Sequence, residues 1–272
     1  MLNPQSTPAM LPEVLERMNR VLGPATEFIP LHVPEFLGKE RDYVLDCIDT
    51  GWVSSVGSYV DRFEVELAAA CGTARAIVVV NGTAALHLAM IVAGVKPNDE
   101  VIIPALTFAA TANAVHHLGA VPHFVDSCET TLGLDPVALA AHLRQVAVTR
   151  PEGLVNKATG RRISCVVPMH VFGHAIDMDA LNAVAAEFGL VVVEDAAESL
   201  GSQYKGRPCG SLSTISALSF NGNKIITTGG GGMVLCDAAK AKRAKHLSTT
   251  AKLPHAYEYR HDELGYNYRL PN

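Results

Sequence analysis

The stretch Ala76-Ile-Val-Val-Val80-Asn-Gly-Thr83 decides the fold, because a short run of branched apolar residues passes directly into a helical pattern. The continuous apolar run 76–80 is typical of a strand buried on both faces of a sheet. From Thr83 to Ala93 the apolar residues recur at the spacing of a helix. This alternation of short apolar runs and helical patterns continues along the chain.

The alternation predicts the remaining elements. Strands are expected at residues 100–103, 121–125, 163–167, 190–193, 214–219 and 233–236, and helices at 38–50, 60–71, 107–118, 136–148 and 178–188. Buried strands joined by helices indicate an α/β fold of three layers with a mostly parallel central sheet. Residues 149–162 are polar, and we expect them to form a surface loop.

The two ends of the chain depart from this pattern. Residues 1–27 hold four prolines around one short amphipathic segment, so we expect an N-terminal arm there. Residues 28–250 are expected to form one large domain. Residues 251–272 have no helix-ending or tail character and are interpreted as the start of a connection to a further small domain.

Composition excludes several classes of protein. Of the 272 residues, 49% are hydrophobic and 18% charged, as in a globular protein with a core. The net charge of −5, without a basic stretch, argues against nucleic-acid binding. The sequence has no signal-peptide pattern and no run of about 18 apolar residues that could span a membrane. With nucleic acid disfavoured, a small-molecule partner is expected. Six scattered cysteines suggest reduced thiols in a cytoplasmic protein.

Ligands of such folds collect beyond the carboxyl ends of the strands. The first strand enters its helix through Asn81-Gly82-Thr83, where a helix N-terminus and a glycine that allows close approach suit a phosphate. The alternative is that Asn81 or Thr83 only caps the helix. After the next strand comes Phe108, which either stacks on a planar ring or belongs to the core.

Two charged residues follow later strands. Asp195, beside Glu194 and near Glu198, ends an apolar run, and a buried carboxylate there needs a positive partner unless it caps a helix. Lys224 lies between the apolar run 216–220 and four glycines. A lysine removed from water loses its proton more easily and can then attack a carbonyl carbon, although most lysines in loops reach solvent instead.

Together these parts are those of a pyridoxal phosphate (PLP) site: a lysine, a carboxylate, a phosphate cradle and an aromatic ring. Two other motifs are only weak signals for a different kind of site. The glycines 229–232 lack the spacing of a dinucleotide-binding loop. His170 and His174 are four residues apart, but Gly173 and the preceding strand argue against a zinc site on one helical face. His116 and His117 are adjacent and are interpreted as structural or surface residues.

Five motifs in order resemble the DegT/DnrJ/StrS family of PLP-dependent sugar aminotransferases. They are Asn81-Gly-Thr-Ala-Ala-Leu86, Pro104-x-x-Thr-Phe-x-Ala-Thr-x-Asn113, Glu194-Asp-Ala-Ala-Glu-Ser-Leu-Gly201, Ser219-Phe-Asn-Gly-Asn-Lys224 and Gly265-Tyr-Asn-Tyr-Arg269. The resemblance runs from about Pro30 to the last residue and implies the large domain of a fold-type I PLP transferase. The resemblance implies that family chains continue into a small C-terminal domain, which we expect to be missing from the sequence given.

The resemblance implies a role for each matching residue. Lys224 is the lysine that holds the cofactor covalently and moves the proton between the amino donor and the cofactor. Asp195 pairs with the pyridine nitrogen of the cofactor, and Phe108 takes the ring-stacking place.

Further contacts are implied around the cofactor. Gly82, Thr83 and Ser219 contact the phosphate, and Glu198 lies beside the cofactor or the sugar. Asn267 reaches the phosphate of a neighbouring subunit, which implies a homodimer with shared active sites.

The implied reaction moves an amino group from an amino acid, taken as L-glutamate, to a keto nucleotide sugar. The stretches Asp49–Gly57 and Ser219–Lys224 resemble the branch that aminates C4 of UDP-4-keto-6-deoxy-N-acetylhexosamines on the route to bacillosamine and legionaminic acid. Another nucleotide-sugar 3- or 4-aminotransferase and a non-catalytic fragment remain alternatives. A sugar dehydratase is disfavoured, because related dehydratases carry histidine in place of the lysine.

Overall fold

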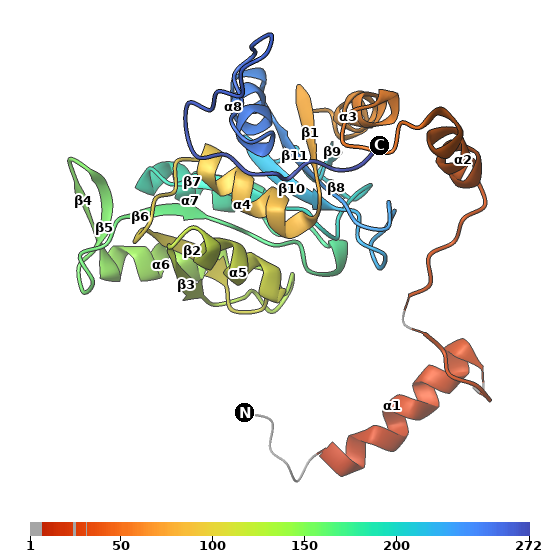
Figure 1. The fold of residues 1–272 in the computed structure, drawn as a ribbon. Helices are drawn as coiled ribbons and strands as arrows, with labels where there is room; N and C mark the ends of the chain where they lie inside the picture. The colour runs from red at the N-terminus through yellow and green to blue at the C-terminus, as the bar shows by residue number, and fades with distance from the viewer. Residues whose placement is uncertain (1–6, 24–25, 31) are drawn as a thin grey trace. The chain divides into compact units, whose positions relative to one another are not determined.

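The computed structural model describes residues 7–23, 26–30 and 32–272 (Figure 1). The chain divides into two compact units, Met1–Glu35 and Phe36–Asn272. The first unit contains the helix α1 (Thr7–Leu22), which covers and extends the amphipathic segment predicted near the N-terminus. Residues 1–6 and 24–25 of the predicted arm lie outside the described residues.

The second unit is built around a seven-stranded sheet. Its strands, in spatial order, are β1 (Arg75–Val79), β11 (Gly232–Cys236), β10 (Ile215–Ser219), β7 (Val191–Asp195), β6 (Ile163–Val166), β2 (Glu100–Pro104) and β3 (Val121–Val125). From β10 to β3 all neighbours are parallel, whereas β11 is antiparallel to both β1 and β10. The predicted strands and the mostly parallel sheet are therefore confirmed.

Helices cover both faces of this sheet, as Figure 1 shows. Alternate side chains of each strand point to opposite faces. One face packs on α4 (Gly82–Val92), α5 (Ala109–His117) and α8 (Ala238–Ser248). The other packs on α3 (Ser58–Cys71), α6 (Pro136–Val146) and α7 (Met178–Phe188). The sheet and the helices on its two faces are the three layers that the sequence predicted. A further helix, α2 (Glu40–Thr50), precedes α3 in the chain.

Local chemistry sets the ends of these helices. Asn81, Asp135 and Asp237 cap α4, α6 and α8 by accepting hydrogen bonds from backbone N–H groups of the first turn. Three helices, α2, α3 and α7, end at glycines in the left-handed conformation, which glycine adopts without steric cost.

The segment 149–162 is not the surface loop that we expected. It takes part in a hairpin of β4 (Ala147–Arg150) and β5 (Gly153–Asn156). Asn156 and Thr159 donate hydrogen bonds of 2.8 and 2.5 Å to the buried carboxylate of Glu100 at the start of β2. The polar composition of the segment was misleading, because two of its polar side chains, Asn156 and Thr159, bind a buried carboxylate far away in the sequence.

A further helix and two short strands were also missed. The helix α8 has an alanine-rich and lysine-rich sequence, in which small buried residues give only a weak hydrophobic pattern. The short strands β8 (Gln203–Tyr204) and β9 (Arg207–Pro208) pair with each other outside the main sheet. All six cysteines are free thiols, and five of them are buried, as expected for reduced cysteines.

Candidate active site

A cavity of about 280 Å³ lies at the carboxyl ends of the parallel strands. Its volume is near the lower end of the range for small-molecule pockets, about 300 Å³. Elements far apart in the sequence form it. Seven residues that the sequence singled out are among those that line it: Gly82, Thr83, Phe108, Asp195, Glu198, Ser219 and Lys224.

The N-terminus of α4 forms one wall of the cavity. Asn81 Oδ1 accepts a hydrogen bond of 2.8 Å from the Ala84 N–H, so Asn81 is the helix cap that one alternative predicted. A Cβ atom on Gly82 would lie 2.7 Å from Ser219 Cβ, so only glycine lets the end of β10 approach the helix this closely. The first N–H groups of a helix have no partner within the helix, and with the Thr83 and Ser219 hydroxyls they suit a phosphate.

The Asp195 carboxylate lies at the end of β7, with 3% of the residue exposed. The Thr111 hydroxyl of α5 donates to Oδ2 at 2.8 Å, and the Ala197 N–H donates to Oδ1 at 3.2 Å. Burial raises the pKa of the Asp195 carboxyl, and these two hydrogen bonds, with the nearby charge of Lys224, oppose the rise. A turn follows Asp195, so this carboxylate does not cap a helix.

Lys224 extends from the turn after β10 into the cavity. Only 10% of its side chain is exposed, so it does not reach solvent like an ordinary loop lysine. Its Nζ lies 3.0 Å from Glu198 Oε1 and 5.5 Å from the centroid of the Phe108 ring. Phe108 immediately precedes α5 and is 62% exposed, which rules out the alternative that it belongs to the core.

Asn267 is not among the residues that line this cavity. It is exposed, its backbone forms an isolated bridge with Thr249, and its Oδ1 accepts a hydrogen bond of 3.0 Å from Arg269 Nε. Its role at the phosphate of a neighbouring subunit stays a prediction.

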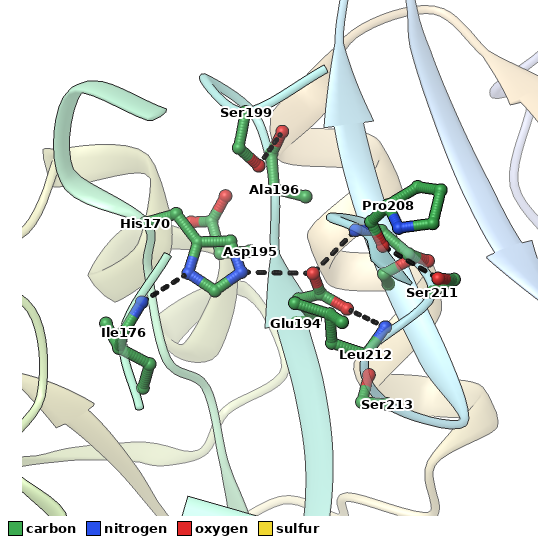
Figure 2. A network of polar contacts seen from close by, with 12 residues as sticks. His170, Ile176, Glu194, Asp195, Ala196, Ser199, Pro208, Ser211, Leu212 and Ser213 are labelled. Atoms are coloured by element: carbon green, nitrogen blue, oxygen red, sulfur yellow. Dashed lines mark hydrogen bonds and ion pairs between the residues drawn. The ribbon is translucent and has the colours of Figure 1, made fainter. Parts of the chain in front are cut away.

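A fully buried polar network lies beside Asp195 (Figure 2). His170 Nε2 is 3.0 Å from Glu194 Oε1. The same carboxylate accepts hydrogen bonds from the N–H groups of Gly210, at 2.6 Å, and Leu212, at 2.9 Å. The Ile176 N–H donates to His170 Nδ1 at 3.4 Å. Both polar ends of the His170 ring therefore have partners.

This network is not arranged as a metal site, although Cys209 also lies close to His170 and Glu194. Both carboxylate oxygens already accept backbone hydrogen bonds. Burial and the nearby Glu194 raise the pKa of the Cys209 thiol to about 11, whereas a metal binds the thiolate. His174 is exposed while His170 is buried, so these two histidines do not share a site.

Sequence reasoning missed Thr111 and the partners of Glu194. One signal was available, because adjacent residues of a strand point to opposite faces and Glu194 and Asp195 therefore cannot both face the cavity. His116 and His117 are exposed, in agreement with their interpretation as surface residues.

The fold and this cavity define the class as a fold-type I PLP transferase. Residues 36–272 match the sequence model of the DegT/DnrJ/EryC1/StrS aminotransferase family, and the chain belongs to this family. Aminotransferases of this family depend on PLP. No helix within the described residues is both long and apolar enough to cross a membrane.

Relatives of known name cover most of the chain. The GDP-perosamine synthase of Caulobacter vibrioides is 40% identical over 244 residues, which are 90% of this chain and 62% of that protein. The structure of 3-amino-5-hydroxybenzoic acid synthase matches with a TM-score of 0.79 at 34% sequence identity. The match covers 91% of this chain and 61% of the synthase chain. The structure of DesI in the presence of its TDP-sugar product matches with a TM-score of 0.75 at 32% sequence identity. The match covers 94% of this chain and 62% of the DesI chain. The chain spans less than two thirds of the length of each relative.

Proposed function

We propose that this chain is the PLP-binding domain of a nucleotide-sugar aminotransferase, a cytoplasmic homodimer that transfers an amino group from L-glutamate to a keto nucleotide sugar. The observation that carries the proposal is the convergence of Lys224, Asp195 and the N-terminus of α4 on one cavity. Bound PLP supplies a ring that accepts electrons from the reacting carbon.

The residues around the cavity fit this cofactor. The close approach of Gly82 to Ser219 brings the Ser219 hydroxyl beside the N-terminus of α4, where it and the Thr83 hydroxyl can both donate to a phosphate. Asp195 is buried and accepts hydrogen bonds from two donors among the described residues, so its carboxylate retains capacity to pair with a protonated ring nitrogen.

Lys224 and Phe108 complete the cofactor site. The amine of Lys224 is within the cavity and is the nucleophile for the cofactor carbonyl and the carrier of the transferred proton. Phe108 covers one face of the ring, because its exposed aromatic side chain lies next to Lys224. Glu198 pairs with the lysine at 3.0 Å and borders the space for the sugar.

The acceptor is proposed to be a 4-keto-6-deoxy nucleotide sugar. The names of the relatives support a sugar linked to a nucleoside diphosphate, since they include a GDP-perosamine synthase and a protein determined with a TDP-sugar product. The motifs at Asp49–Gly57 and Ser219–Lys224 favour a UDP-linked N-acetylhexosamine. Asn267 is proposed to complete the phosphate site of a second subunit.

Cofactor binding is tested by adding PLP to the purified chain and recording its absorption near the edge of the visible range. We expect a band that is trapped by borohydride on Lys224 and is lost in Lys224→Ala. The matched control is Lys205→Ala, a surface lysine paired with Asp179. Retention of the trapped adduct in Lys224→Ala would refute the assignment of the lysine.

The reaction is tested by mixing the PLP-loaded chain with L-glutamate. Release of 2-oxoglutarate supports the enzyme, whereas its absence supports the alternative of a non-catalytic fragment. GDP-, dTDP- and UDP-linked 4-keto-6-deoxy sugars, with and without a 2-acetamido group, then identify the acceptor. Preference for a 3-keto sugar would favour the alternative of a 3-aminotransferase.

A further inference from the structure

Glu194 and Asp195 are consecutive residues of β7 that face opposite layers. Val193, on the same face as Asp195, packs in the cluster with α4 and α5, and Val192, on the same face as Glu194, packs in the cluster with α6 and α7. Asp195 therefore faces the cavity, and Glu194 faces away from it. Figure 2 shows the Glu194 carboxylate directed toward the segment from Pro208 to Ser213.

The Glu194 carboxylate has no exposed surface and depends on three donors. Two are the backbone N–H groups of Gly210 and Leu212, and the third is His170 Nε2. A buried carboxylate is costly unless hydrogen bonds compensate for the lost water. The Ile176 N–H donates to His170 Nδ1, so the neutral ring with its proton on Nε2 satisfies both neighbours.

The backbone of the same histidine pairs with Asp195. The His170 N–H donates to the Asp195 carbonyl oxygen at 3.2 Å, and the Asp195 N–H donates to the Pro168 carbonyl oxygen at 2.9 Å. The segment after β6 thus holds two adjacent residues of β7, Asp195 by its backbone and Glu194 by its side chain. The segment also packs closely behind Glu198, because a Cβ atom on Gly173 would lie 2.7 Å from the Glu198 carbonyl oxygen.

We propose that His170 is a positioning residue for Asp195, and that its Nε2–H bond to Glu194 fixes the end of β7 so that the Asp195 carboxylate faces the cofactor ring. Without that donor, the buried Glu194 carboxylate loses one of its three partners and moves toward another donor. This movement changes the segment that holds Asp195. The inference rests on the proposed function, since Asp195 matters here through its contact with PLP.

The test compares variants that differ in the donor. His170→Phe keeps a ring but has no donor, and His170→Gln places an amide N–H close to the position of Nε2. The measurements are the dissociation constant for PLP and the visible circular dichroism of the bound cofactor. Leu143→Ala, at a fully buried position of α6, is the control for general destabilisation.

We expect the dissociation constant for PLP to rise about tenfold in His170→Phe, by analogy with the loss of affinity when the hydrogen-bond partner of a metal ligand is removed. The circular dichroism of the bound cofactor should change with it, and His170→Gln should restore most of both. Leu143→Ala should lower the thermal midpoint without changing either. If His170→Phe does not fold, His170→Asn, whose amide is too short to reach Glu194, replaces it.

Unchanged PLP affinity and dichroism in the variant without the donor would overturn the inference while leaving the proposed function intact. Equal losses in His170→Phe and His170→Gln would also overturn it, because the shape of the ring and not its donor would then be what counts. Failure of the unaltered chain to bind PLP would overturn the proposed function and this inference with it.

Discussion

Lys224 Nζ lies 3.0 Å from Glu198 Oε1 inside the cavity at the carboxyl end of β7. The Glu198 side chain is 31% exposed, so the pair is partly screened by solvent and contributes little to stability. Its importance is geometric. The amine must leave the carboxylate before it can form a bond to a carbonyl carbon, so the pair opposes the first covalent step.

Replacing Glu198 by glutamine should therefore speed the covalent capture of PLP. We expect an increase of about fivefold, the factor that corresponds to about 1 kcal/mol for a partly exposed ion pair. Stopped-flow absorption at the band of the bound cofactor measures this rate. Glu187→Gln is the matched control, because Glu187 pairs with Arg144 on the surface at 2.9 Å. A slower capture in Glu198→Gln would show that the carboxylate assists the lysine.

The charge of Asp195 should matter more than its shape. Asp195→Asn keeps the size of the side chain but removes the partner for a protonated ring nitrogen. We expect PLP to remain bound to Lys224 while the rate of 2-oxoglutarate release falls about 100-fold, as when one preorganised electrostatic contact is lost. Single-turnover measurements with L-glutamate test this. A rate within a few-fold of the unaltered chain would contradict the role of the carboxylate.

Thr111 supports this carboxylate from α5. Thr111→Val is nearly isosteric and removes the 2.8 Å hydrogen bond to Asp195 Oδ2. Burial, which raises the pKa of the Asp195 carboxyl, is then less opposed. We expect the same single-turnover rate to fall about tenfold, the lower end for a hydrogen bond to a charged group. An unchanged rate would show that the Ala197 N–H and nearby charges suffice.

The residues at the strand ends could be predicted from sequence because short-range signals mark them. An apolar run that stops at Asp195, or a glycine between a strand and a helix at Gly82, has a local reason that topology then brings to one edge of the sheet. The partners of these residues carry no such signal. His170 meets Glu194 only after β6 and β7 have paired, and Thr111 meets Asp195 only because α5 packs on the sheet.

The same distinction explains the errors in secondary structure. The segment 149–162, which includes most of the hairpin β4–β5, was expected to be a loop because it is polar. The buried partner of its Asn156 and Thr159, Glu100, lies on another strand. The helix α8 was missed because Ala241 and Ala244 bury little apolar surface and so produce a weak pattern. In both cases the stabilising contacts are distant in sequence.

Gly82 should tolerate no side chain. Its Cβ would lie 2.7 Å from Ser219 Cβ and 2.9 Å from Ser219 Oγ, so Gly82→Ala must push β10 away from α4. We expect the dissociation constant for PLP to rise about tenfold, equivalent to about 1.4 kcal/mol of strain, within the range for overpacking. An absorption titration measures it. Gly222→Ala, next in sequence to the cavity-lining Asn221 and Asn223 but with no atom within 4 Å of the new Cβ, should bind normally. Equal affinities in the two variants would contradict a phosphate site that depends on the close approach of Gly82 to Ser219.

His87, which does not line the active-site cavity, makes the free energy of unfolding depend on pH. Burial lowers the pKa of His87 to about 4, with the charge of His117 adding to the effect, and its Nδ1 lies 3.2 Å from the Tyr268 hydroxyl. The group titrates near 6.5 when unfolded, so between pH 6.5 and 4 the unfolded chain binds more protons and stability falls as pH falls. We expect His87 to account for a loss of about 3 kcal/mol in the free energy of unfolding over that window. Urea unfolding at several pH values should show a shallower pH dependence in His87→Gln. His116→Gln, at an exposed position, should keep the original slope, and parallel curves for all three proteins would contradict the prediction.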